Sequence, residues 1–90
     1  MEPVDVHEVK LDPYYAADLL SGRKRFEIRR DDRDYKVGDI LRISTNNAGT
    51  PLTIDCVIVY KLVPSDPHAD GLAPGYCALG LGALLSVTMP

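Results

Sequence analysis

Apolar and polar residues alternate along most of this 90-residue chain, which is the pattern of half-buried β-strands. The alternation is strictest from Lys24 to Arg30, where Phe26 and Ile28 would face one side of a strand and the charged residues the other. An apolar run from Cys56 to Tyr60 predicts a strand buried on both faces or a bulge. Further strands are predicted over Val6 to Leu11, Ile40 to Ser44, Leu52 to Val63, Tyr76 to Leu81 and Leu84 to Val87.

One segment has helical rather than strand periodicity. Asp12 supplies a side-chain acceptor for an N-cap, Pro13 suits the first helical position, and Gly22 suits the C-terminal cap. Between them, apolar residues recur at helical spacing (Tyr15, Ala16, Leu19 and Leu20). We therefore expect one principal helix from Pro13 to Leu20, which is so short that packing must stabilise it.

Turn-forming residues separate these elements. They predict a turn at Val37-Gly38-Asp39, a loop from Asn46 to Pro51 and a longer surface loop from Pro64 to Pro74. No repeat or linker divides the sequence, so residues 1–90 are expected to form a single domain. One helix with five or six short strands indicates a mainly β fold of the α+β class, namely a small, mostly antiparallel barrel or half-open barrel.

The charge of the chain is unevenly distributed. The net charge is −3, yet the segment from Arg23 to Arg42 carries eight basic and five acidic residues. An acidic protein with one basic segment is poorly suited to coating nucleic acid without selection, but it can bind a short polyanion at one place.

The cysteines and the apolar segments indicate in which cellular compartment the protein is expected. Cys56 and Cys77 both lie in apolar runs, which indicates two reduced thiols in a cytoplasmic protein, with a disulfide as the alternative. The longest apolar stretch, from Tyr76 to Met89, is shorter than the roughly 20 residues that span a bilayer. The segment from Met1 to Asp12 has no apolar run of the kind found in signal peptides. We expect no membrane association.

The motif G-x-K-x-x-E-x-R, which begins at Gly22, carries the most specific chemistry. Lys24, Glu27 and Arg29 place an ammonium, a carboxylate and a guanidinium within one short stretch. On a strand, Glu27 and Arg29 would project from one face about 7 Å apart, whereas the direction of Lys24 is open. The three can bind a phosphate, a base edge or a polarised carbonyl, or they can form an exposed ion-pair ladder without a ligand. We expect these three charges to be exposed, so that removing any one of them changes the free energy of unfolding little.

The motif, followed by Val37-Gly38-Asp39-Ile40-Leu41, resembles the ASCH domain, a relative of the PUA RNA-binding fold. The longer string from Phe26 to Asp39, together with Gly75-Tyr76, is similar to a compact bacterial and phage subgroup of that family. The resemblance covers nearly the whole chain and implies a PUA-like β-barrel. It also implies binding of RNA or a nucleotide in a cleft beside the helix, with a predicted ligand set of Lys24, Arg25, Glu27, Arg29 and Tyr35.

The same resemblance raises the possibility of an enzyme. One bacterial ASCH branch is an amidohydrolase that deacylates an acylated cytidine, and another has ribonuclease activity. The first branch shares the lysine at Lys24 but has a threonine at the position of Glu27, and it uses a late glutamate where this sequence has none after Glu27. If the protein is a hydrolase, Lys24 and Glu27 are the expected catalytic residues. A third alternative is an accessory protein-binding module, with the apolar C-terminal tail forming a homodimer.

Outside the motif, the histidines and their neighbours are the other candidate site residues. Asp66, His68 and Asp70 have a spacing that superficially resembles metal ligands, but they lie in a proline-broken loop without further ligands nearby in sequence, so we expect no metal and no cofactor. His7, in the first predicted strand, is a candidate partner for the motif.

Overall fold

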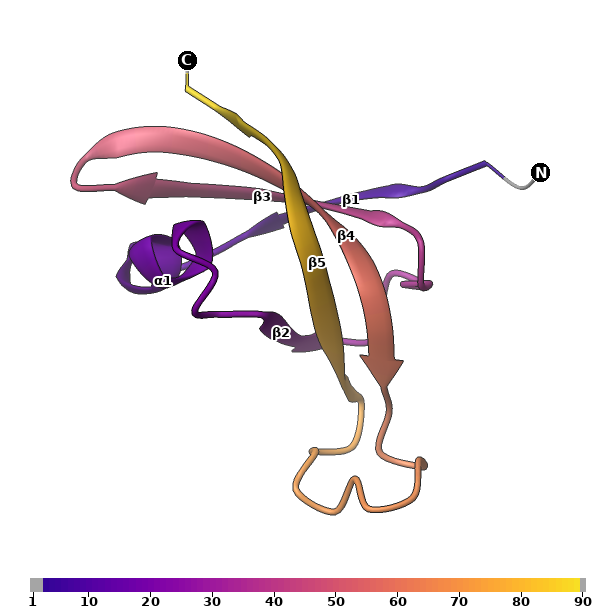
Figure 1. Ribbon diagram of the computed structural model, residues 1–90. Helices are drawn as coiled ribbons and strands as arrows, with labels where there is room; N and C mark the ends of the chain where they lie inside the picture. Colours follow the sequence, from indigo (N-terminus) through magenta and orange to yellow (C-terminus); the bar gives the residue numbers. More distant parts are fainter. Residues whose placement is uncertain (1–2, 90) are drawn as a thin grey trace.

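A computed structural model describes residues 3–89 of the protein as one curled five-stranded sheet with a short helix (Figure 1). The strands follow the order β1-β3-β4-β5-β2 across the sheet. The elements along the chain are β1 (Val6–Lys10), a 3-10 turn (Pro13–Tyr15), α1 (Ala16–Leu20), β2 (Phe26–Arg30), β3 (Ile40–Asn47), β4 (Thr50–Leu62) and β5 (Tyr76–Thr88).

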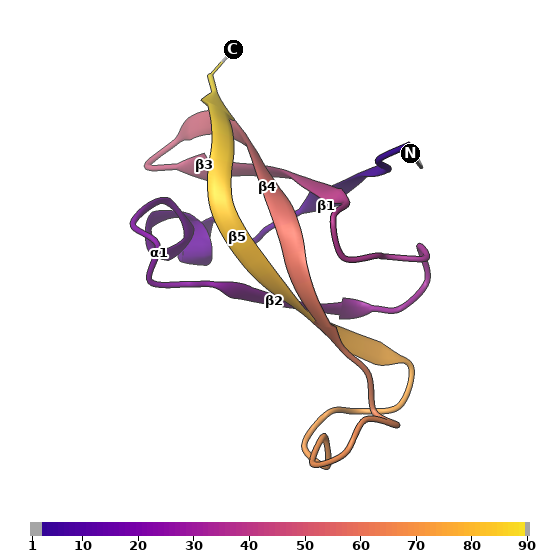
Figure 2. The ribbon, with the colours of Figure 1, turned by 45° about the vertical axis from the view of Figure 1, so that its right-hand side comes forward.

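The sheet forms a half-barrel that is open between its two end strands. β3, β4 and β5 make an antiparallel meander, β2 joins β5 antiparallel, and β1 joins β3 parallel. Figure 2 shows β1 and β2 on the two sides of the opening, with α1 at one end of it. The predicted mainly β fold with one short helix is therefore confirmed. No helix within residues 3–89 has the length and apolar character needed to cross a membrane.

The predicted helix is present and begins as the sequence indicated. The Asp12 side chain accepts a hydrogen bond from the Tyr14 backbone N–H at 2.9 Å, and the first turn is 3-10 rather than α-helical. Ala16 and Leu19 bury the inner face of α1. Gly22, at φ +81°, donates its N–H to the Leu19 carbonyl and ends the helix in a conformation that favours glycine.

Two predictions about strand boundaries were wrong. The segment from Asn46 to Pro51 is mostly strand, because β3 and β4 continue to a tight turn at Ala48 and Gly49, both with positive φ. The segments predicted as separate strands, Tyr76 to Leu81 and Leu84 to Val87, form the single strand β5. The register between β4 and β5 shifts along their length, and these shifts change which residues of β5 face inward. The apolar alternation in the sequence is interrupted there, so it predicted two strands where there is one. The shifts also confirm a bulge within β4.

The core fills the inner face of the half-barrel. Its largest fully buried side chains come from β3, β4 and β5: Leu41, Ile43, Ile54, Cys56, Ile58, Cys77 and Leu79. Both cysteines are free and have no exposed surface. Burial raises the pKa of Cys56 to about 11, with a further increase from Asp55 and Glu27, and burial likewise raises the pKa of Cys77. Both groups are therefore neutral thiols that pack as small apolar side chains.

We predict that native protein reacts slowly with iodoacetamide at pH 8, because the thiolate is the reactive form and burial suppresses it. After unfolding, both Cys56 and Cys77 should be alkylated, as measured by intact mass. Rapid labelling of the native protein would contradict the buried placement. An unfolded, unreduced sample that resists labelling and is roughly 2 Da lighter would show a disulfide instead.

Candidate functional site

The strand that carries the motif is inverted relative to an ordinary half-buried strand. In β2, Glu27 faces the interior and is only 5% exposed, whereas Phe26 and Ile28 are each 53% exposed on the outer face. The interpretation of Lys24, Glu27 and Arg29 as an exposed charge ladder is therefore wrong for the glutamate. A carboxylate in this position must have compensating partners, since an isolated buried charge is very costly.

Both neighbouring cations of the motif provide that compensation. Lys24 Nζ lies 2.9 Å from Glu27 Oε1, and Arg29 NH1 lies 3.0 Å from Glu27 Oε2. The three side chains are mostly buried, at 13%, 7% and 24% exposed respectively for Lys24, Glu27 and Arg29. The direction of Lys24, which the sequence left open, is thus inward, and the ion triad carries one net positive charge.

Lys24 has additional contacts that fix its ammonium group. Nζ donates to the Phe26 carbonyl at 2.6 Å, and it lies 4.7 Å from the centre of the Phe26 ring and 5.3 Å from that of Tyr15. A cavity of about 260 Å³ adjoins it, lined by Tyr15, Asp18, Arg23, Lys24 and Phe26. The amine therefore lies in a partly aromatic environment at the edge of a cavity.

Arginine side chains bridge the opening of the half-barrel. Besides its bond to Glu27, Arg29 NH1 donates to the Lys10 carbonyl of β1 at 2.9 Å, and Arg33 NH1 donates to the Glu8 carbonyl of the same strand. The end strands β1 and β2 are thus joined by guanidinium groups where a closed barrel would have backbone hydrogen bonds. We call this junction the seam.

A groove of about 490 Å³ lies along the seam. It is lined by Glu8, Val9, Lys10, Arg29, Arg33 and Ser44, so three cations face one exposed acid. A second hollow of about 290 Å³ shares Arg29 and Arg33 and adds Arg30, Asp32, Tyr35 and Tyr76. The Arg30 guanidinium lies over the Tyr76 ring at 5.5 Å. Cationic donors and an aromatic ring therefore occur together on the β2 side of the seam.

Of the remaining predicted site residues, Arg25 lies apart from the ion triad, whereas Tyr35 lies beside Arg29. Arg25 turns back to the Gly22 carbonyl and lines a different groove, beside Leu81 and Leu84. Tyr35 lines the hollow beside Arg33 but is only 3% exposed, and its ring packs edge-to-face against His7 with centroids 4.8 Å apart. Burial raises the pKa of Tyr35, although Arg33 and Arg29 oppose that increase. Of the tyrosines at this hollow, Tyr76 is the more accessible one.

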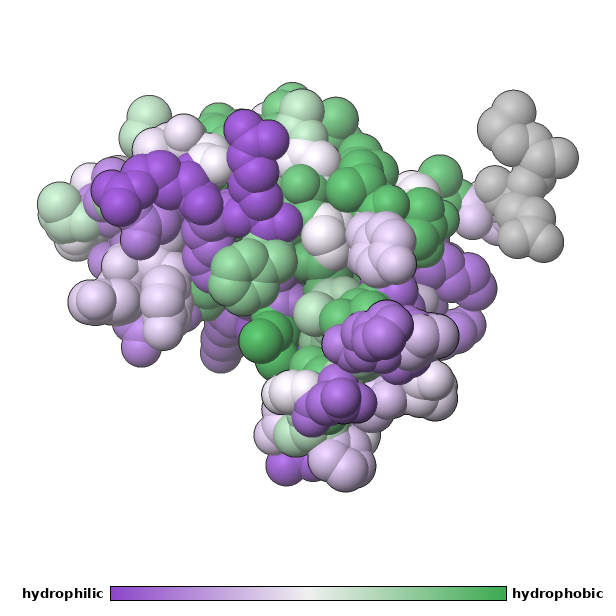
Figure 3. Space-filling model, turned by 60° about the horizontal axis from the view of Figure 1, so that its bottom comes forward, coloured by the Kyte–Doolittle hydropathy of each residue, from purple (hydrophilic) through white to green (hydrophobic). Residues whose placement is uncertain are grey.

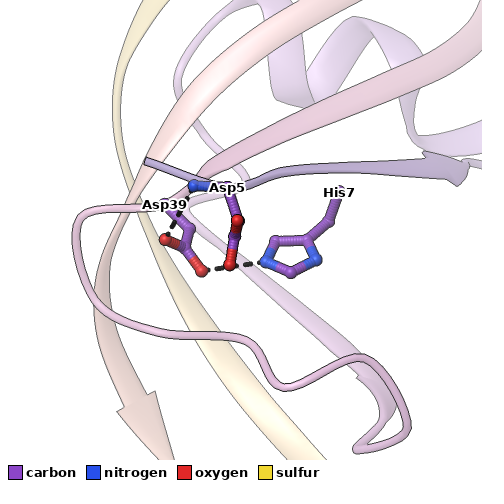
Figure 4. Close-up of side chains that lie close together, drawn as sticks. All are labelled: Asp5, His7 and Asp39. Carbon is purple, nitrogen blue, oxygen red and sulfur yellow. Dashed lines mark hydrogen bonds and ion pairs between the residues drawn. The ribbon is translucent and has the colours of Figure 1, made fainter. Parts of the chain in front are cut away.

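A second polar cluster, which sequence reasoning missed, joins β1 to the start of β3. His7 Nε2 and Asp39 Oδ2 are 2.9 Å apart, and the Asp5 backbone N–H donates to the buried Asp39 carboxylate (Figure 4). That carboxylate also accepts a bond from the Lys36 backbone N–H. His7 therefore pairs with Asp39 and not with the motif. The only sequence signal was the strand phase, because Val9 and Leu11 place His7 on the same inner face.

The carboxylate oxygens and the imidazole nitrogen of this cluster lie close enough together that they could bind a metal ion. One ligand atom each from Asp5, His7 and Asp39 falls within 4.8 Å of the others. However, both Asp39 oxygens already accept hydrogen bonds, and a cation on His7 Nε2 would displace the bond to Asp39. Lys36 also lies 3.5 Å from the Asp5 carboxylate, where it repels a cation. The arrangement serves to fix β1 on β3.

Glu27→Gln tests the buried ion triad. Removing the carboxylate charge leaves Lys24 and Arg29 close together without an anion, so the free energy of unfolding should fall by about 2–4 kcal/mol, somewhat less than for a fully buried pair. Urea denaturation measures this. The control is Asp18→Asn, which removes the exposed partner of Arg23 at 3.8 Å and should change stability by less than about 0.5 kcal/mol. Equal effects of the two substitutions would contradict the assignment.

Asp39→Asn tests the cluster on β1 through its pH dependence. Burial tends to raise the pKa of Asp39, but the bonds from His7 and from the Lys36 and Asp5 backbone outweigh it, and the pKa is lowered. The ionised carboxylate therefore stabilises the fold above the ordinary aspartate pKa of about 3.9, and this contribution is lost as pH falls through the lowered folded value. The variant should melt at lower temperature than the wild type at pH 7, and the difference should shrink below about pH 4. A pH-independent difference would contradict this role.

Comparison with known proteins places the chain in a family. A protein of Escherichia phage P2, "Uncharacterized 12.9 kDa protein in GpA 3'region", is 50% identical over 36 residues, which are 40% of this chain and 33% of that protein. The match thus spans a third of the phage protein's length. Residues 6–81, which run from β1 into β5 and include the motif and the seam, match the family described as Domain of unknown function (DUF3850). The chain belongs to the DUF3850 family.

Proposed function

We propose that the protein binds RNA or a nucleotide at the seam between β1 and β2. The observation that carries this proposal is the groove where Lys10, Arg29 and Arg33 gather on a protein that is acidic as a whole. Three cations around a groove form a concentrated site for phosphate, whereas the negative remainder of the molecule opposes binding elsewhere. The resemblance of the motif to ASCH domains, which implies a PUA-like barrel, supports the same ligand class.

The two arginines suit phosphate recognition because they are held in place before a ligand arrives. Each uses NH1 to hold a β1 carbonyl, and Glu27 further orients Arg29. A guanidinium has five N–H donors in a rigid planar arrangement, so other donors are available to a phosphate oxygen. Within residues 3–89, no acceptor bonds the remaining nitrogens of Arg33. Preorganised donors reduce the entropy lost when the ligand binds.

A base would be recognised on the Tyr76 side of the site. Tyr76 and Arg30 lie in the hollow that shares Arg29 and Arg33 with the groove, and stacking on an aromatic ring or a guanidinium plane is the common mode for unpaired bases. We therefore assign phosphate contacts to Arg29 and Arg33 and base stacking to Tyr76. The buried Tyr35 lines the same hollow without contacting the base. Lys24 and Glu27 act by positioning Arg29.

A second candidate function is a hydrolase acting on an acylated nucleoside or on RNA. The observation in its favour is the Lys24–Glu27 pair beside the 260 Å³ cavity, since such a pair can exchange a proton with a bound substrate. However, Lys24 Nζ donates to both Glu27 and the Phe26 carbonyl, which engages the ammonium as a cation and not as a nucleophile. Binding is therefore the function that the geometry supports better.

Binding of a short single-stranded RNA, measured by fluorescence anisotropy over a range of salt, tests the proposal. Arg33→Ala should weaken binding about tenfold or more, since a charge-assisted hydrogen bond contributes about 1.5–3 kcal/mol. The slope of log K against log salt concentration should become shallower by roughly 0.7 per lost phosphate contact. Arg23→Ala, at an exposed site away from the seam, is the matched control and should change affinity less than twofold.

Equal weakening by the Arg33 and Arg23 substitutions, or no binding by the wild type, would overturn the seam as the binding site. The same protein samples are then incubated with a panel of acylated nucleosides and RNA. Turnover by the wild type that Lys24→Ala abolishes, while substrate still binds, would favour the hydrolase over simple binding.

A further inference from the structure

One edge of the sheet is unpaired in a way that the rest of the protein avoids. The pairing of β5 with β2 ends at Gly80, and the Leu81 N–H makes the last bond on that side, to the Arg25 carbonyl. From residue 82 to residue 88, β5 pairs with β4 on its other side, and no strand within the described chain covers the outer edge. In Figure 1 this part of β5 continues beyond β2 towards the C-terminus, with β4 as its neighbouring strand.

Unpaired strand edges are usually protected by charge, by proline or by covering side chains. The edge of β1 is protected in this way, since Arg29 and Arg33 bond its carbonyls. The outer edge of β5 has no charge of its own, since the sequence carries no charged side chain from Gly71 to Met89; Lys24 and Arg25 line the groove beside residues 81–84. Leu85, Val87 and Met89 are 56%, 47% and 65% exposed. This edge combines open backbone groups with exposed apolar side chains.

We propose that a second copy of this chain pairs with residues 82–88 of β5, antiparallel and about a twofold axis, so that the two sheets become continuous. In such a pair, centred on Leu85, the residue at the twofold axis lies opposite its own counterpart and the others pair within the same segment, so a charge near the centre would meet a like charge. The uncharged segment avoids this repulsion, and its valine and threonine residues favour strand pairing.

The surface next to the edge has room for the added strand. A groove of about 330 Å³ lies between α1 and β5, with Leu19, Leu20, Leu81 and Leu84 among its lining residues. Figure 3 shows that hydrophobic surface also extends over the neighbouring outer face of the sheet. Because the paired segment is short, the interface is smaller than that of obligate dimers, and dimerisation should depend on concentration.

Sedimentation velocity from about 10 μM to about 1 mM tests the proposal, and the wild type should shift from monomer to dimer within that range. Leu85→Lys places a charge at the centre of the edge and should weaken dimerisation at least tenfold. The residue is not part of the core, so the variant should fold, as circular dichroism would verify. Val37→Lys is the matched control, since Val37 is 61% exposed in the loop before β3, and it should leave the dimer constant within about twofold.

Hydrogen exchange locates the interface. Amides from Ala83 to Thr88 should exchange more slowly at high protein concentration in the wild type but not in Leu85→Lys. A wild type that remains monomeric to about 1 mM, or one whose dimer survives Leu85→Lys unchanged, would overturn the proposal. Exchange at these amides that is independent of concentration while a dimer forms would also overturn it, because the copies would then meet at another surface.

Discussion

The Arg29 guanidinium is the contact on which the open half-barrel depends. It bonds Glu27 on its own strand and the Lys10 carbonyl on the facing strand, so a single group neutralises a buried carboxylate and bridges the seam. A sheet that closed by backbone hydrogen bonds would not need a buried charge on its end strand. Here the inner face of β2 is polar because its side chains, and not its backbone, must reach across to β1. The outward position of Phe26 and Ile28 follows from that requirement.

Short sequence patterns predicted correctly those features that depend on hydrogen bonds between residues close in the chain. The Asp12 cap and the Gly22 terminus depend on hydrogen bonds within a few residues, and both were predicted correctly. The loop predicted from Asn46 to Pro51 failed because polar residues there are held in strand by pairing along a hairpin that extends beyond the core. The propensity of a residue for loop or strand is a property of that residue alone, whereas the hydrogen bonds between two paired strands form cooperatively. Tertiary context therefore overrides the propensity of the polar residues in this hairpin.

The candidate site was predicted in part for the same reason. Lys24, Glu27 and Arg29 are close in sequence, and the structure brings them together. Their burial was not foreseen, because the alternation of β2 is equally consistent with either face turned inward, and apolar residues normally take the inner one. The His7–Asp39 pair joins residues 32 positions apart, and its contact depends on parallel pairing of β1 with β3, which no short-range pattern encodes. Lys10 and Arg33 were not predicted as site residues, because they lie near Arg29 only where β1 and β2 face each other across the seam.

The seam has a further consequence for motion. The two end strands of the sheet are neighbours along the chain, so the bonds that bridge the opening connect residues only 19 and 25 positions apart. The conformational entropy released when such short loops open is small. The largest fully buried side chains lie in the β3–β5 meander, while Val9 and Leu11 are the core residues on the β1 side of the seam. Separation of β1 from β2 is thus a local fluctuation that leaves the meander folded. We expect the groove to widen and narrow through such fluctuations, and an anion that joins the two strands would oppose their separation.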